Sequence, residues 1–150
     1  MAANVLNMHI VPLQTSTEIV TLLKSCGLSV EDLHEDSRTQ FFGLSSSSGL
    51  AGVIGVEHYG TYGLLRSLAV HVNFRNEGIG RMLAEHAEQW AKNQGMTELF
   101  LLTTTASGFF SRLGYTDSIR SEAPEAIQRT PQFSSLCPSS SQFMHKLIPA

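Results

Sequence analysis

The chain has 150 residues, a formal net charge of −3, 42% hydrophobic residues and 15% charged residues. This balance is typical of a soluble globular protein and excludes a disordered chain, and the length suits one domain spanning residues 1–150. Lys and Arg do not cluster, so no nucleic-acid partner is expected. No apolar run approaches the roughly 20 residues that span a bilayer, and the N-terminus lacks a signal-peptide pattern. We therefore expect a cytoplasmic protein without a membrane partner.

The first half of the chain is predicted to contain strands and short helices. A strand is expected over residues 4–13, followed by a helix that Thr15 or Ser16 caps and Gly27 ends. A short second helix is expected over residues 29–36. Residues 40–44 and 51–59 have the pattern of two strands joined by a Ser-rich hairpin loop, and a turn at 60–63 leads to a strand over 63–72.

The second half begins with the clearest helix, which Gly95 ends. Its apolar positions share one face at helical spacing: Ile79, Met82, Leu83, His86, Ala87 and Trp90. Further predictions are a strand at 98–103, a helix at 105–113, a strand at 115–119, a short helix near 124–129 and a strand at 142–148. The long connection over 121–141 is typical of a functional loop. This order predicts an α/β (α+β) fold, with a mixed sheet covered by helices on both faces.

One short motif lies between the predicted strand at 63–72 and the helix after it. Arg75, Gly78 and Gly80 form the pattern R-x-x-G-x-G. A helix N-terminus offers free N–H groups and a positive dipole end, and glycines allow a ligand to approach the backbone closely. The motif therefore predicts a site for a phosphorylated group.

Two blocks of sequence together resemble the GNAT superfamily of acyl-CoA-dependent N-acyltransferases. The first family pattern, L-x-V-x-P-x-x-R-x-x-G-x-G, is matched at Leu68, Val70, Arg75, Gly78 and Gly80, with Val72 in place of proline. The second, N-x-x-A-x-x-F-Y-x-x-x-G-F/Y, is matched at Ala106, Phe109, Gly114 and Tyr115. The resemblance implies the GNAT fold, N-acetyltransferase activity and acetyl-CoA as co-substrate.

The resemblance also implies where acetyl-CoA binds. Backbone groups of Val70 and Val72 would pair with the pantetheine arm, and amides of residues 76–81 would hold the pyrophosphate. A main-chain N–H near Val70, freed by a bulge, would stabilise the oxyanion. The implied cofactor-binding residues are Leu68, Val70, Val72, Arg75, Asn76, Glu77, Gly78, Ile79, Gly80, Arg81, Thr103, Ala106, Phe109 and Phe110.

Two positions depart from the family pattern. Phe110 stands where many members carry a tyrosine that protonates the leaving thiolate, and Thr103 replaces an asparagine. We assign no general acid; Ser107 or a water could substitute. An ordinary thiol has a pKa near ~8.5 and leaves readily as the anion, so the reaction does not require the tyrosine.

The acceptor side is predicted from isolated charged residues. Glu57 is the expected general base, with His58 and His71 as alternatives. Arg66 interrupts an apolar strand, where a charge is rarely buried without a partner. It could hold a carboxylate, or an oxyanion of arsenic or phosphorus, through two hydrogen bonds. Alternatively, it is an arginine at the sheet rim with its head in water. No metal site is expected, because the six histidines lack ligand spacing.

Residues 64–70, 101–115 and 130–141 together resemble a small subgroup of arsenic-resistance acetyltransferases. Cys137 could present a thiol to the acceptor, or be a small apolar core residue. The sequence thus predicts an N-acetyltransferase for a small, anionic amino compound, with a resistance role. The alternatives are a non-catalytic acetyl-CoA sensor and a protein N-acetyltransferase. A homodimer is also compatible with the sequence.

Overall fold

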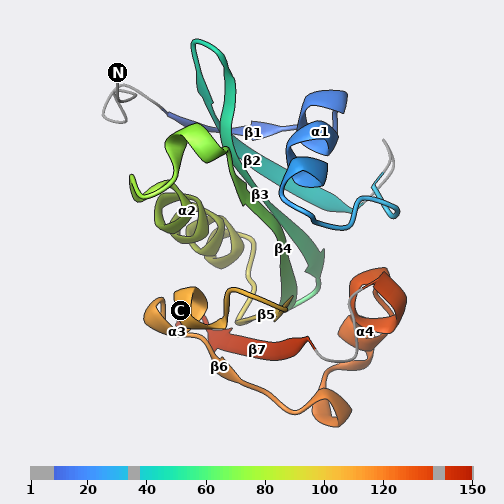
Figure 1. Cartoon of the computed structure of the whole chain (residues 1–150). Coiled ribbons are helices and arrows are strands. Elements are labelled where there is room, and N and C mark those ends of the chain that lie inside the picture. The colour runs from blue at the N-terminus through green and yellow to red at the C-terminus, as the bar shows by residue number, and fades with distance from the viewer. Residues whose placement is uncertain (1–8, 34–37, 137–140, 150) are drawn as a thin grey trace.

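The structure of the chain is a computed structural model in which residues 9–33, 38–136 and 141–149 are described (Figure 1). Its strands are β1 (Ile10–Leu13), β2 (Thr39–Ser46), β3 (Gly49–Tyr59), β4 (Tyr62–Val70), β5 (Glu98–Thr103), β6 (Thr116–Asp117) and β7 (Gln142–Leu147). Its α-helices are α1 (Thr17–Ser25), α2 (Ile79–Asn93), α3 (Ser107–Arg112) and α4 (Glu125–Gln128). Three further short helical turns are η2 (Val72–Phe74), η3 (Arg120–Glu122) and η4 (Gln132–Leu136).

The seven strands form one mixed sheet in the order β1-β2-β3-β4-β5-β7-β6. All neighbours are antiparallel except β4 and β5, which are parallel. That parallel pairing covers only Tyr62–Glu98, Gly63–Leu99 and Leu64–Phe100. Beyond Leu64 and Phe100, β4 and β5 no longer pair with each other, so the sheet opens between these two strands. The predicted mixed sheet is confirmed.

Helices cover both faces of the sheet, as the sequence predicts. Alternate strand residues point to opposite faces, so Leu65 packs beneath α2 while its neighbour Leu64 packs against α4. In the same way Phe42 contributes to the α2 side and Phe41 to the α1 side. Helices α2 and α3 therefore cover one face, and α1 and α4 cover the other (Figure 1). Within the described ranges, no helix is long and apolar enough to cross a membrane.

Several predicted boundaries are wrong. Within residues 29–33 the chain forms a turn, in which Leu33 donates its N–H to Val30 O at 3.0 Å, rather than the start of a helix. Strand β4 ends at Val70, not at residue 72, because His71 Nδ1 accepts the N–H of Asn73 at 3.1 Å and turns the chain into η2. Val72 lies in that turn and is 65% exposed.

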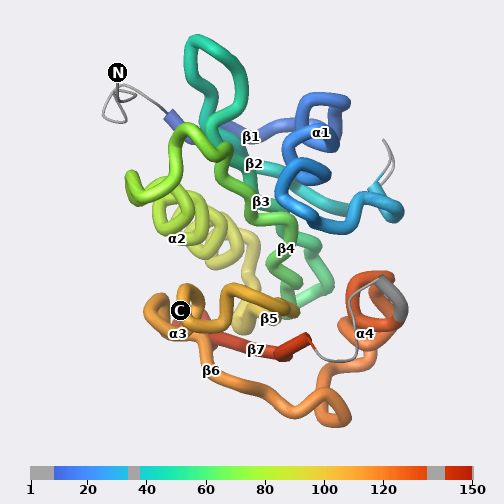
Figure 2. The backbone as a smooth tube through the Cα atoms, viewed as in Figure 1, coloured from blue at the N-terminus to red at the C-terminus, as the bar shows by residue number. Residues whose placement is uncertain are grey.

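The smoothed path in Figure 2 shows which distant segments come together near the gap in the sheet. The segment that follows α1 and the segment around α4 lie on the same side of the sheet. Helix α2 and its preceding loop lie on the other side. The open ends of β4 and β5 therefore have different segments on their two sides.

Candidate active site

A cavity of about 310 Å³ occupies the gap where β4 and β5 separate. Its walls come from three segments and four single residues that are distant in sequence. They are the end of α1 and the following loop (26–29), β4 (65–70), the end of β5 with its following loop (101–106), and the side chains of Arg75, Phe110, Gln132 and Ser141.

The backbone of Val70 faces this cavity. His71 donates its N–H to Ala51 O of β3 at 2.8 Å. Because successive residues of an antiparallel strand direct their N–H and C=O groups to opposite edges, those of Val70 point away from β3 and into the gap. Arg75 Nε donates to Val70 O at 3.2 Å, while the N–H of Val70 faces the cavity. The edge of β4 at Val70 can therefore form backbone hydrogen bonds with an extended molecule in the gap.

A bulge interrupts β4 just upstream of Val70. Gly55 pairs with Arg66 and Val53 pairs with Ala69, so Ser67 and Leu68 together lie opposite Ile54. Ser67 has a φ of 59°, in the left-handed region that non-glycine residues seldom adopt. Two residues against one is the mark of a β-bulge, and Ser67 and Leu68 both line the cavity.

The loop before α2 has the properties of an anion site. Asn76 and Gly78 adopt left-handed φ values of 67° and 79°, and α2 has no side-chain N-cap. Met82 donates its N–H to Gly78 O at 3.1 Å, so the preceding N–H groups of Ile79 to Arg81 lack acceptors within the helix. A Cβ atom on Gly78 would meet nothing within 4 Å, so the space beside Gly78 itself is open. This arrangement fits a phosphate group.

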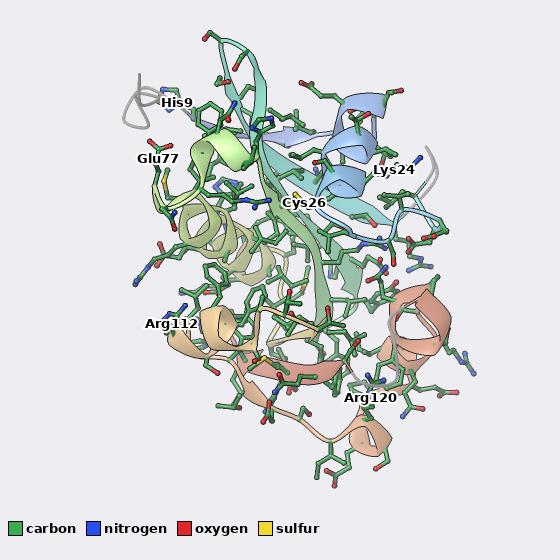
Figure 3. All side chains as sticks on the ribbon, in the orientation of Figure 1. His9, Lys24, Cys26, Glu77, Arg112 and Arg120 are labelled. Atoms are coloured by element: carbon green, nitrogen blue, oxygen red, sulfur yellow. The ribbon has the colours of Figure 1, made fainter. Side chains whose placement is uncertain are left out.

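Gly80, the second glycine of the motif, is required for helix packing. A Cβ atom on Gly80 would lie 3.2 Å from Cζ of Phe109, so Gly80 allows α2 and α3 to pack closely. Phe109 itself belongs to the core on the α2 side and does not line the cavity. Glu77 lies on the outer side of the loop before α2 (Figure 3).

The start of α3 forms the opposite wall. Thr103 Oγ1 accepts the N–H of Ala106 at 2.9 Å, so the residue that replaces the family's asparagine holds the turn before α3. Phe110 lines the cavity and is 6% exposed. Tyr115 donates its hydroxyl to Glu88 Oε2 at 2.9 Å, and burial raises the pKa of Tyr115. Among the described residues no tyrosine lines this cavity.

Arg66 is part of a buried charge cluster with Asp32 and Glu57. Its Nη1 donates to Glu57 Oε2 at 2.8 Å and also to Asp32 Oδ2, and its Nη2 donates to Asp32 Oδ1 at 2.9 Å. Its Nε donates to Ser67 Oγ at 2.9 Å. The Arg66 side chain is only 2% exposed. Burial lowers the pKa of Arg66, but Asp32 and Glu57 outweigh burial and raise it. The Asp32–Arg66–Glu57 cluster carries one more negative than positive charge.

The predicted bases do not lie on the cavity wall. Glu57 is 4% exposed, and its Oε1 accepts the hydroxyl of Tyr59 while its Oε2 accepts from Arg66. Burial, followed by Glu57, raises the pKa of Tyr59. His58 Nε2 hydrogen bonds with Gly60 O at 2.8 Å, and His71 holds the turn at η2.

Asp32 and Cys26 are among the residues near the cavity that sequence reasoning did not identify. Asp32 is the partner that a buried arginine requires, and Arg66 itself was the signal that a carboxylate had to lie nearby. Cys26 lines the cavity, with Sγ at 3.7 Å from Arg75 Nη2 and 3.9 Å from Val70 O. Figure 3 shows its side chain between α1 and β4. The predicted substrate residue Cys137 lies outside the described residues.

Comparison with known sequences gives one family and two relatives. The sequence model of the acetyltransferase (GNAT) domain matches residues 37–117, more than half of the chain. The chain is similar to an uncharacterized N-acetyltransferase of Chlorobaculum tepidum, with 41% identity over 103 residues, covering 67% of this chain and 64% of the relative. It is also similar to an amino-acid acetyltransferase of Serratia proteamaculans, with 35% identity over 54 residues, covering 36% of this chain and 12% of the relative. The chain thus spans less than two thirds of the curated relatives it matches.

Comparison with solved structures shows the same fold. N-acetylglutamate synthase from Neisseria gonorrhoeae, complexed with coenzyme A and N-acetyl-glutamate, superposes with a TM-score of 0.76 and 19% identity, over 95% of this chain and 36% of that chain. Tetrahymena GCN5 superposes with a TM-score of 0.73 and 16% identity, over 94% of this chain and 96% of that chain. At these identities the likeness concerns the fold alone.

Proposed function

The chain belongs to the GNAT acetyltransferase family, and from that premise we propose that it transfers the acetyl group of acetyl-CoA to the amine of a small amino compound. One observation carries the proposal. The cavity between the diverging strands β4 and β5 exposes the backbone of Val70, and the uncapped start of α2 lies at the end of the loop that follows β4.

The site fits acetyl-CoA in its chemistry. We place the pantetheine arm along the β4 edge at Leu68 and Val70, where the N–H of Val70 faces the gap as in strand addition. We place the pyrophosphate over residues 76–81, where donors without helical acceptors adjoin open space. Val72 lies outside the strand, so the proposed pairing rests on Val70.

The residues present suffice for direct transfer between two bound substrates. Holding the amine against the thioester supplies much of the rate. The bulge at Ser67 and Leu68 lines the cavity, and a main-chain N–H that the bulge frees from the ladder would donate to the developing oxyanion. Phe110 provides no proton, so the thiolate leaves unprotonated or is protonated by solvent.

Glu57 as general base is still a prediction. Its two oxygens accept from Tyr59 and Arg66, and it adjoins the cavity through Arg66. Replacement of Glu57 by Gln tests the assignment through the pH dependence of the rate. Loss of the acidic limb would support Glu57, whereas a retained limb would leave water as the immediate proton acceptor.

Two observations bear on the acceptor. The cavity volume of about 310 Å³ suits a small molecule, and the similarity to an amino-acid acetyltransferase favours an amino acid or a related compound. A more anionic acceptor, including an arsenic- or phosphorus-containing amino acid in a resistance role, is the second candidate. The support for this second candidate is the positive charge of Arg66. Because Asp32 and Glu57 already pair with Arg66, we propose amino acids in general as the acceptor class, ahead of these more anionic compounds.

An acceptor screen tests the proposal. Release of free coenzyme A from acetyl-CoA is measured with amino acids, phosphinothricin-like compounds, arsenical amino acids, polyamines and peptides. Turnover of amino acids would support the proposal. Tight acetyl-CoA binding without release for any amine would instead identify a sensor, and turnover of peptides alone would identify a protein N-acetyltransferase.

A further inference from the structure

We propose that Asp32 is a positioning residue: through its two-pronged contact with Arg66 it holds the loop formed by residues 26–33 against β4, and so sets which acceptors the cavity admits. The inference rests on the proposed function for its kinetic part. The part that concerns the position of the loop stands on contacts alone.

The loop forms one wall of the cavity. Its residues 26–29 line the cavity, and Asp32 lies at its other end. Local bonds shape the loop: Leu28 donates its N–H to Leu23 O at 3.0 Å, and Val30 donates its N–H to Glu31 Oε2 at 3.1 Å. These bonds stay within α1 and the loop. The contact from Asp32 to Arg66 joins the loop to the sheet across 34 positions of sequence.

The anchor on the sheet is buried and hydrogen-bonded. Arg66 is 2% exposed in its side chain, Glu57 5% and Asp32 11%. Glu57 is fixed in turn by the hydroxyl of Tyr59, and Arg66 Nε binds Ser67 Oγ at the bulge. Asp32 therefore connects the acceptor-side loop to the segment of β4 that lines the cavity, through a buried arginine with three hydrogen-bonding partners.

The geometry of the Asp32–Arg66 contact, rather than charge balance, points to a role for Asp32 beyond stability. Glu57 alone neutralises Arg66, at 2.8 Å. Asp32 is thus a second carboxylate on a cation that already has a partner, and the guanidinium of Arg38, 5.5 Å from the Tyr59 ring centroid, adds a further positive charge nearby. The two-pronged geometry fixes both the distance and the angle between loop and strand. Positioning of the loop is the purpose that this geometry serves.

The test uses Cys26 as a reporter at the base of the loop. The chain has two cysteines, so in a C137S background Cys26 is the single thiol. Its reaction rate with a thiol-specific reagent measures how tightly the loop lies against β4. D32N removes the negative charge of Asp32 and one prong of the contact while Arg66 keeps Glu57. E31Q is the matched control, because Glu31 is an exposed carboxylate of the same loop that does not touch Arg66, and glutamine keeps an oxygen that can accept the N–H of Val30.

We expect D32N to raise the Cys26 rate by about fivefold or more, because local opening controls access to a half-buried thiol. E31Q leaves the rate unchanged, and D32E restores most of the protection. In the natural chain, D32N raises the acceptor KM by about tenfold with kcat and acetyl-CoA affinity within about twofold, since it alters acceptor placement alone.

The inference is overturned if D32N leaves the Cys26 rate unchanged, or if KM, kcat, acetyl-CoA affinity and melting temperature all deteriorate together. If D32N does not fold, R66K takes its place, because lysine keeps the charge but cannot form the two-pronged contact; an unchanged thiol rate in R66K would also overturn the inference. Failure of every acceptor in the screen would refute the proposed function and leave the thiol result valid.

Discussion

Replacement of Arg66 by Met tests the Asp32–Arg66–Glu57 cluster most directly. Met fills much of the same space but leaves two carboxylates, 11% and 5% exposed in their side chains, without a cation. Removal of one member of a buried ion pair typically costs about 3–5 kcal/mol of folding free energy.

The same magnitude follows from proton binding. The folded variant can avoid a buried uncompensated charge by protonating a carboxyl group. For a carboxyl group with an ordinary pKa near ~4, this costs roughly 4 kcal/mol at pH 7 and roughly 1.4 kcal/mol at pH 5, at 1.36 kcal/mol per pH unit. The stability lost in R66M should therefore shrink as the pH falls, since the folded variant takes up a proton that the unfolded chain does not.

The assay is urea unfolding of the natural chain and of R66M at pH 7 and pH 5, with the difference in unfolding free energy as the readout. The matched control is R129M, because Arg129 pairs with Glu125 at the surface, with side chains 77% and 75% exposed. Loss of such a surface pair should cost less than about 1 kcal/mol at either pH. A loss below about 1 kcal/mol in R66M at pH 7, or an equal loss at both pH values, would refute the reasoning.

Three further predictions concern other parts of the fold. Gly78→Ala forces a side chain into a φ of 79°, at a cost of about 1–2 kcal/mol, and should weaken acetyl-CoA binding in calorimetry. Tyr115→Phe removes the hydrogen bond to Glu88 and should cost about 1–2 kcal/mol in denaturation while leaving the pH–rate profile unchanged. Burial lowers the pKa of His86, so the unfolded chain binds a proton before the folded one does, and stability falls as the pH drops below the unfolded value near ~6.5. His86→Leu should flatten that fall, measured by unfolding at pH 7.5 and pH 5; a fall as steep as in the natural chain would exclude His86 as its source.

The sequence predicts α2 well because its signals are local. Five residues at helical spacing are buried on one side, and Gly95 with a φ of 87° follows its end. Apart from the helix expected over residues 29–36, the order of strands and helices is also recovered. These features depend on residues within a few turns of one another.

The features that sequence reasoning missed depend on distant contacts. The end of β4 at Val70 depends on a side chain, His71, that accepts from the backbone instead of extending the strand. Residues 29–33 form no helix, and they place Asp32 against Arg66, a residue 34 positions away. Glu57 was identified as an isolated carboxylate near a strand end, and only the packing of β3 against β4 shows that both its oxygens are engaged.

The short junction between β4 and β5 divides the backbone ladder into two blocks, β1–β4 and β5–β7–β6, which share only three residue pairs. Local opening of the native state is expected at this junction, because few backbone hydrogen bonds must break to separate β4 from β5. Amide hydrogens that face the junction should exchange with solvent sooner than those inside either block. A ligand that binds to both β4 and β5 would hold the two blocks together. Ligand binding should therefore slow amide hydrogen exchange in both blocks at once.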